Sequence, residues 1–159
     1  MASDKAIRED LIWLLEGGHA HAKFDDVVGD FPADGVSIRP KGASHSAWEI
    51  LEHMRIAQND ILRFSLSRDY VSPDWPEGYW PAGPGAEDQG GWAQSVRSFR
   101  KDLAEFVNLI RDPERDIYEK FPWGTGQTLL REALLIADHN SYHLGELVLV
   151  RRLLGIWHS

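Results

Sequence analysis

The chain has 159 residues, and its 17 Lys and Arg against 25 Asp and Glu give a net charge of −8. This length lets one domain, 1–159, bury a core without disulfides. The acidic balance argues against nucleic acid and anionic membrane surfaces as partners, since both would repel the protein. With seven His and no Cys, any metal must be held by His, Asp or Glu.

The N-terminal residues mix charged and apolar side chains and contain no apolar run of signal-peptide length. The most apolar stretch, 133–150, is interrupted by Asp138, His139, His143 and Glu146, which argues against a transmembrane helix. We therefore expect a cytoplasmic protein.

Four stretches have the three- and four-residue apolar spacing of amphipathic helices, and none alternates with a period of two. The first covers about 5–31, although Gly17 and Gly18 weaken its later part. The second starts cleanly after Ser46, which forms an S-x-x-E capping box with Glu49.

The third helical stretch keeps its apolar spacing over 92–110, and Asp112 and Pro113 end it. The fourth begins after Thr128, a plausible N-cap, and runs to Leu154, with Gly155 as its stop signal. Segment 71–85 is rich in Pro, Gly and Trp, which excludes a helix there. The sequence predicts an all-α four-helix bundle with one long Pro/Trp-rich crossover loop between helices 2 and 3.

Three histidines fall on the inward faces of two of these helices. His139 and His143 are four residues apart, so they project from one face of the last helix. His53 occupies an inward position on the second helix, between Ile50 and Ala57. Three neutral imidazoles that meet in a bundle match a site with three protein ligands and one open position, as zinc uses in catalysis.

Each histidine also has a simpler interpretation, as a core side chain bonded to a backbone carbonyl. Taken together they favour a metal, because three imidazoles buried without a shared partner would leave nitrogens unsatisfied at about 1–3 kcal/mol each. A diiron carboxylate site is excluded, since no Glu precedes His139 or His143 by three residues. Asn140 after His139 excludes an H-E-x-x-H metalloprotease motif.

Two further residues are candidates for catalysis. Glu146 lies on the same face as His143 and is interpreted as a fourth ligand, a partner of a ligand, a general base or a partly exposed side chain. His21, on the inward stripe of the first helix, is a candidate proton carrier or a packed histidine. His45 and His158 are interpreted as bystanders, at the start of the second helix and at the chain end.

The segments Trp48-Glu49-Ile50-Leu51-Glu52-His53 and Asp138-His139-Asn140-Ser141-Tyr142-His143 resemble the DinB-like superfamily of bacterial metal-binding four-helix bundles. The resemblance extends over nearly the whole chain. It implies that His53, His139 and His143 hold one divalent metal ion, usually zinc or nickel, often in a homodimer. Characterised relatives include S-transferases that use bacillithiol or mycothiol and a thiol-dependent maleylpyruvate isomerase.

The leading functional hypothesis is a metal-dependent enzyme that transfers a low-molecular-weight thiol to an electrophilic substrate. The metal would favour the thiolate and supply a nucleophile that a chain without cysteine lacks. One alternative is a hydrolase that uses metal-activated water, with Glu146 or His21 moving protons. Another is a metal-binding structural or stress protein without turnover.

Overall fold

Local capping signals decide where the principal helices begin and end. The computed structural model describes residues 2–83, 85 and 89–157. Over these residues the helices are α1 (Ala2–Glu16), α2 (Phe24–Val28), α3 (Ala47–Leu66), α4 (Gln89–Arg111) and α5 (Leu129–Leu153), with one 3₁₀ turn, η1 (Glu77–Tyr79). The described residues include no strand, only one isolated bridge between Lys120 and Thr128. The fold is all-α, as expected.

The start of α3 and both ends of α5 follow the sequence signals. Ser46 and Glu49 form both hydrogen bonds of the capping box that begins α3. The Thr128 side chain accepts from the Arg131 amide at the start of α5. Gly155, with φ of +72°, follows the end of α5 in the left-handed conformation that glycine tolerates best.

The expected first helix over 5–31 is wrong in its second half. Helix α1 ends at Glu16, and Gly17 and Gly18 follow with φ of +65° and +77°. Two successive left-handed residues cannot continue a right-handed helix, so the chain turns and resumes only in the five residues of α2. The weak later part of the predicted helix was therefore a helix end followed by a separate short helix.

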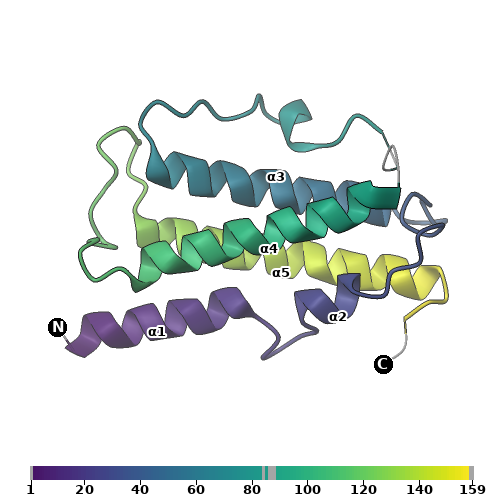
Figure 1. The fold of residues 1–159 in the computed structure, drawn as a ribbon, viewed down its shortest axis with the longest axis horizontal. Coiled ribbons are helices and arrows are strands. Elements are labelled where there is room, and N and C mark those ends of the chain that lie inside the picture. Colours follow the sequence, from purple (N-terminus) through teal and green to yellow (C-terminus); the bar gives the residue numbers. More distant parts are fainter. Residues whose placement is uncertain (1, 84, 86–88, 158–159) are drawn as a thin grey trace.

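Two neighbouring helices of the bundle run in the same direction. Figure 1 shows α3 and α4 parallel, with α1 and α5 running the opposite way. A parallel pair needs a connection that returns along the full length of a helix. Residues 67–83, which contain η1, make this return along the outer side of α3 (Figure 1).

The apolar core has two halves with polar side chains between them. On α5, one apolar cluster ends at Ala137 and the other begins at Leu144. On α3 the corresponding positions are Ile61 and Met54. Between these positions, or directly next to them in the case of His53, lies a group of side chains that we call the polar layer: His53, Gln58, His139, Asn140 and His143.

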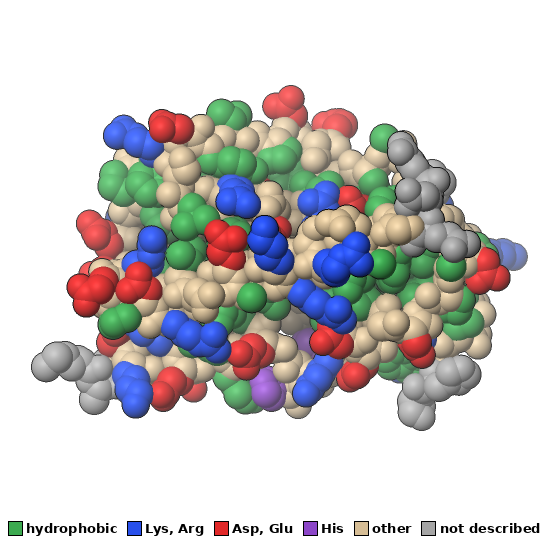
Figure 2. Space-filling model, in the orientation of Figure 1, with side chains coloured by type: hydrophobic (Ala, Val, Ile, Leu, Met, Phe, Trp, Pro, Cys, Tyr) green, Lys and Arg blue, Asp and Glu red, His purple; other side chains and the backbone are tan. Residues whose placement is uncertain are grey.

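The surface carries charges of both signs. On the face shown in Figure 2, acidic and basic side chains are interspersed, and the described residues there form no extended basic patch. Among the described helices, none combines the length and apolar character that a bilayer span requires.

Candidate metal centre

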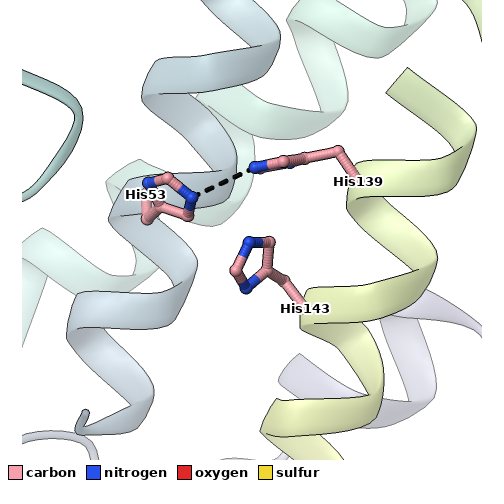
Figure 3. Close-up of side chains that lie close together, drawn as sticks. All are labelled: His53, His139 and His143. Carbon is pink, nitrogen blue, oxygen red and sulfur yellow. Dashed lines mark hydrogen bonds between the residues drawn. The ribbon is translucent and has the colours of Figure 1, made fainter. Parts of the chain in front are cut away.

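Three imidazole rings meet between α3 and α5. His53 projects from α3, and His139 and His143 project from successive turns of α5 (Figure 3). One nitrogen of each ring lies within 4.8 Å of the others, and His53 Nε2 is 3.1 Å from His139 Nε2. His53 and His143 are only 4% and 8% exposed. The structure thus brings together the three histidines that helical spacing placed on inward faces.

A backbone carbonyl sets the orientation of His53. Its Nδ1 lies 2.9 Å from the carbonyl oxygen of Tyr79, the last residue of η1. Because a carbonyl only accepts, Nδ1 carries the proton, and in the neutral ring Nε2 keeps its lone pair. The Nε2 lone pair therefore points toward the other two histidines.

A carboxylate sets the orientation of His143 in the same way. Its Nδ1 lies 2.6 Å from Glu146 Oε2, one helical turn further along α5. A ring N–H that donates to a carboxylate leaves Nε2 free as a ligand, an arrangement that recurs behind metal-binding histidines. Of the interpretations open for Glu146, this contact favours a partner that orients a ligand. Its catalytic role stays a prediction.

Burial keeps the three rings in the form that binds metal. Desolvation lowers the pKa of His53, and it lowers the pKa of His139 and of His143 to about 4. The neighbouring imidazoles lower these values further, since their positive charges would repel. At neutral pH the rings are uncharged, and protons compete little with a metal.

The donor set fits a divalent metal ion. The contact of 3.1 Å between His53 Nε2 and His139 Nε2 is a hydrogen bond, which His139 donates because His53 Nε2 carries no proton (Figure 3). A divalent metal would take the place of that proton. A metal at the meeting point of the three rings satisfies all of them at once. Imidazole suits zinc and nickel, and three protein ligands leave a position open. Within the described part of the chain, His53, His139 and His143 form the group with this geometry.

An aromatic wall closes one side of the cluster. The Trp80 ring stacks on His53 at 4.0 Å between centroids and 4° between planes, and His45 stacks on the other face of Trp80 at 4.1 Å. The Tyr79 hydroxyl donates to Asp60 Oδ2 at 2.7 Å, which fastens the same segment to α3 two turns beyond His53. We call residues 79–80 the strap.

His45 was missed as part of the site, and the strap was one of several open possibilities. From the sequence alone, three interpretations are open for Trp75, Tyr79, Trp80 and Trp123: covering a pocket mouth, capping the end of the core or forming a dimer surface. The clearest signal was the pairing of aromatic residues with prolines in a segment too apolar for a solvated linker. His45, interpreted as a bystander, contacts Trp80 and acts electrostatically on His53, His143 and Glu146.

His21 lies elsewhere. The expectation that it sits on an inward helical stripe is wrong, because the chain is not helical there and the residue is exposed. Its Nδ1 bonds the Ala22 carbonyl, and its Nε2 is 3.3 Å from Ser141 Oγ. It lines a cavity of about 50 Å³ together with Phe24 and Leu144. A role in proton transfer stays a prediction, and His158 lies outside the described residues.

Comparison with known proteins identifies the family. The family model described as the DinB superfamily matches residues 18–147, which include α2 to η1, α4 and most of α5. All three histidines lie within the matched range. Searches of the curated proteins and of the solved structures found no match. Since the family model covers most of the chain, the protein belongs to the DinB superfamily.

Proposed function

We propose that the protein binds one divalent metal ion, zinc or nickel, through His53, His139 and His143 and transfers a low-molecular-weight thiol to an electrophile. The observation that supports this most is the converging set of three neutral imidazoles, two of them oriented by their own acceptors. A closed structural site would have a fourth protein ligand, whereas three ligands are typical of catalytic sites.

When bound, the metal supplies a Lewis-acidic position that favours the thiolate form of a small thiol at neutral pH. The chain has no cysteine of its own, so the sulfur nucleophile must arrive as substrate.

The residues around the cluster would have distinct roles in the transfer. Trp80 covers the His53 ring and excludes water from that side. Glu146 Oε2 holds His143, and Oε1 of the same carboxylate would accept the thiol proton. Burial raises the pKa of Glu146, which makes it a better base. The sulfur electron pair then forms the bond to the electrophilic carbon, and the leaving group departs with its own pair.

The metal site is tested by elemental analysis of purified protein. We expect close to one metal ion per chain in the wild type and a large loss in both His53→Ala and His143→Ala. His19→Ala is the matched control, since His19 is an exposed histidine that stacks on Trp13 in the α1 region. Full metal content in both site variants would overturn the three-histidine site.

The reaction is tested with a panel of small thiols and a chromogenic aryl halide as electrophile. Turnover that is lost on chelation, restored by zinc or nickel, and absent in His143→Ala would support the transferase. Ester or amide hydrolysis without added thiol would replace it with the hydrolase. A metal-loaded protein that turns over no substrate would indicate a structural metal protein.

A further inference from the structure

Two side-chain amides in the polar layer connect three helices next to the metal centre. Gln58 on α3 is 1% exposed, and its Nε2 donates to the Phe99 carbonyl of α4 at 2.8 Å. Asn140 on α5 follows His139 in the sequence, and its Nδ2 donates to Gln58 Oε1 at 2.9 Å. The chain of bonds therefore runs from the α4 backbone, through α3, to a residue beside a metal ligand.

This chain fixes which way each amide faces. The Phe99 carbonyl can only accept, so Gln58 must present its NH₂ group to it. Gln58 Oε1 then faces Asn140, which must donate a hydrogen bond to it from its own NH₂ group. The Asn140 oxygen, Oδ1, is left over, and it is a buried atom without a hydrogen-bond partner in the described structure. A buried acceptor without a donor lowers the stability of the fold by about 1–3 kcal/mol, so the Asn140 oxygen needs an explanation.

His139 is the ligand that needs such an acceptor. His53 donates Nδ1–H to the Tyr79 carbonyl, and His143 donates Nδ1–H to Glu146. His139 Nε2 faces His53 Nε2 in the structure. When that Nε2 binds a metal, the one proton of the neutral ring is on Nδ1, and this N–H needs an acceptor. His139 and Asn140, which carries the oxygen without a partner, are consecutive residues, and both belong to the polar layer.

We propose that Asn140 is the positioning residue of His139: its Oδ1 accepts the Nδ1–H of His139 and so holds Nε2 toward the metal. This inference rests on the proposed metal site and adds the third acceptor to the two already described. Oδ1 has no partner in the described structure, and the contact would form when a metal is held on Nε2 of His139. The hydrogen bond from Asn140 to Gln58 sets the direction of the Asn140 oxygen. The packing of three helices therefore determines which nitrogen of His139 carries the proton.

The Asn140 side chain also lies near the His139 ring. Its hydrogen-bonding contribution to the pKa of His139 opposes the larger lowering by burial and by the other two imidazoles. The direction of the amide itself follows from the hydrogen bonds to Phe99 and Gln58.

The test measures zinc affinity by competition with a chromogenic chelator. Asn140→Leu keeps the shape and removes the acceptor, and we expect its zinc dissociation constant to rise about 10- to 100-fold. Asn140→Asp restores an oxygen and should bind zinc at least as tightly as the wild type, even if the lost bond to Gln58 lowers its melting temperature. Asn59→Leu is the matched control, because it removes an α3–α4 hydrogen bond to Asp102 away from the histidines.

A second readout separates positioning from general destabilisation. In ¹⁵N-labelled, zinc-loaded protein, the Nδ1–H proton of His139 should exchange slowly with water in the wild type and in Asn140→Asp. In Asn140→Leu it should exchange fast, while the far-ultraviolet circular dichroism stays that of a folded helical protein. Zinc affinity and exchange unchanged in a folded Asn140→Leu variant would overturn this inference and leave the metal site intact. A wild type that binds no zinc would instead overturn the proposed function.

Discussion

Two regions of this protein combine histidine with tryptophan, and they differ in burial and in the number of imidazole rings that meet. Between α3 and α5, Trp80 stacks on His53, which is 4% exposed and donates to a carbonyl. In the turn after α1, Trp13 stacks on His19 at 3.8 Å, but both residues are exposed. His19 also has a carbonyl acceptor, because its Nε2 lies 3.0 Å from the Trp13 carbonyl oxygen. What distinguishes the α3–α5 region is burial together with the meeting of three rings.

The comparison shows why spacing alone is insufficient evidence for a site. His21 and His139 both fell on inward stripes of expected helices. Only His139 lies on a helix that continues, because Gly17 and Gly18 end the first helix before His21. The following predictions test the contrast between the two regions, starting with the largest expected effect.

Removing a histidine from each region should separate them completely. We expect His139→Ala to weaken zinc binding by at least about 100-fold, because a site with two protein ligands replaces one with three. His21→Ala should bind zinc like the wild type, since its contacts are to Ala22 and Ser141. Isothermal titration with zinc measures both, and a large loss in His21→Ala would contradict the separation.

Metal removal should destabilise the whole bundle, because the ligands come from two helices. At a free zinc concentration about 1,000 times the dissociation constant, linkage predicts about 4 kcal/mol of added stability, or roughly 10 °C in melting temperature. Thermal melts with zinc and with a chelator measure the difference. His53→Ala should melt at the same temperature in both conditions, whereas His19→Ala should retain the full shift.

The metal-free protein should lose stability on acidification because of the α3–α5 histidines. The folded-state pKa of His139 and of His143 is about 4, below the value near 6.5 expected in the unfolded chain. Between pH 6.5 and 4 the unfolded state therefore binds more protons, so the free energy of unfolding falls as the pH falls through this window.

Urea unfolding from pH 7 to pH 4 measures this loss, which we expect to be on the order of 2 kcal/mol for the pair after allowance for solvent screening. A double variant, His139→Gln with His143→Gln, should lose correspondingly less stability over the same range. His19→Gln with His21→Gln serves as the control in the other region and should follow the wild type. Equal slopes in all three proteins would show that the buried rings do not titrate as described.

The two tryptophan stacks should contribute unequally to metal binding. Trp80→Leu removes the ring that holds His53 from one side, and we expect zinc affinity to fall about 3- to 10-fold, in line with an aromatic pair of about 0.5–1.5 kcal/mol. Trp13→Leu removes a stack of similar geometry on an exposed surface and should change the affinity less than twofold. Chelator competition measures both variants.

Two glycines test the backbone difference between the regions. Gly17 has φ of +65°, so Gly17→Ala should cost about 1–2 kcal/mol although the added methyl has room. Gly145 lies within α5 with open space at its Cβ position, so Gly145→Ala should stabilise the protein by up to about 1 kcal/mol. Urea unfolding measures both, and equal effects would show that α1 does not depend on Gly17 for its end.

Local signals explain what could be predicted. The capping box at Ser46, the N-cap at Thr128 and the stop at Gly155 act within a few residues, so each was readable from the chain. The convergence of the histidines followed from helical periodicity on α3 and α5. The family resemblance, which is confirmed, pointed to the same three residues.

What could not be predicted depends on contacts between distant residues. The hydrogen bond from His53 to the Tyr79 carbonyl joins positions 26 residues apart and forms only because the crossover returns along α3. The stack of His45 on Trp80 has the same origin. The break after α1 was signalled by Gly17 and Gly18, but apolar periodicity beyond them suggested that the helix continued.

The parallel arrangement of α3 and α4 has an evolutionary consequence. Because α3 and α4 are parallel, the crossover has to pass along the outer side of α3. It thereby brings the Tyr79 carbonyl and the Trp80 ring to the histidines without an added domain or helix. Because Tyr79 is attached at His53 and again at Asp60, the chain after the strap can change in length without moving this wall of the site. Differences in length among related proteins are therefore expected after the strap, while the three histidines stay in place.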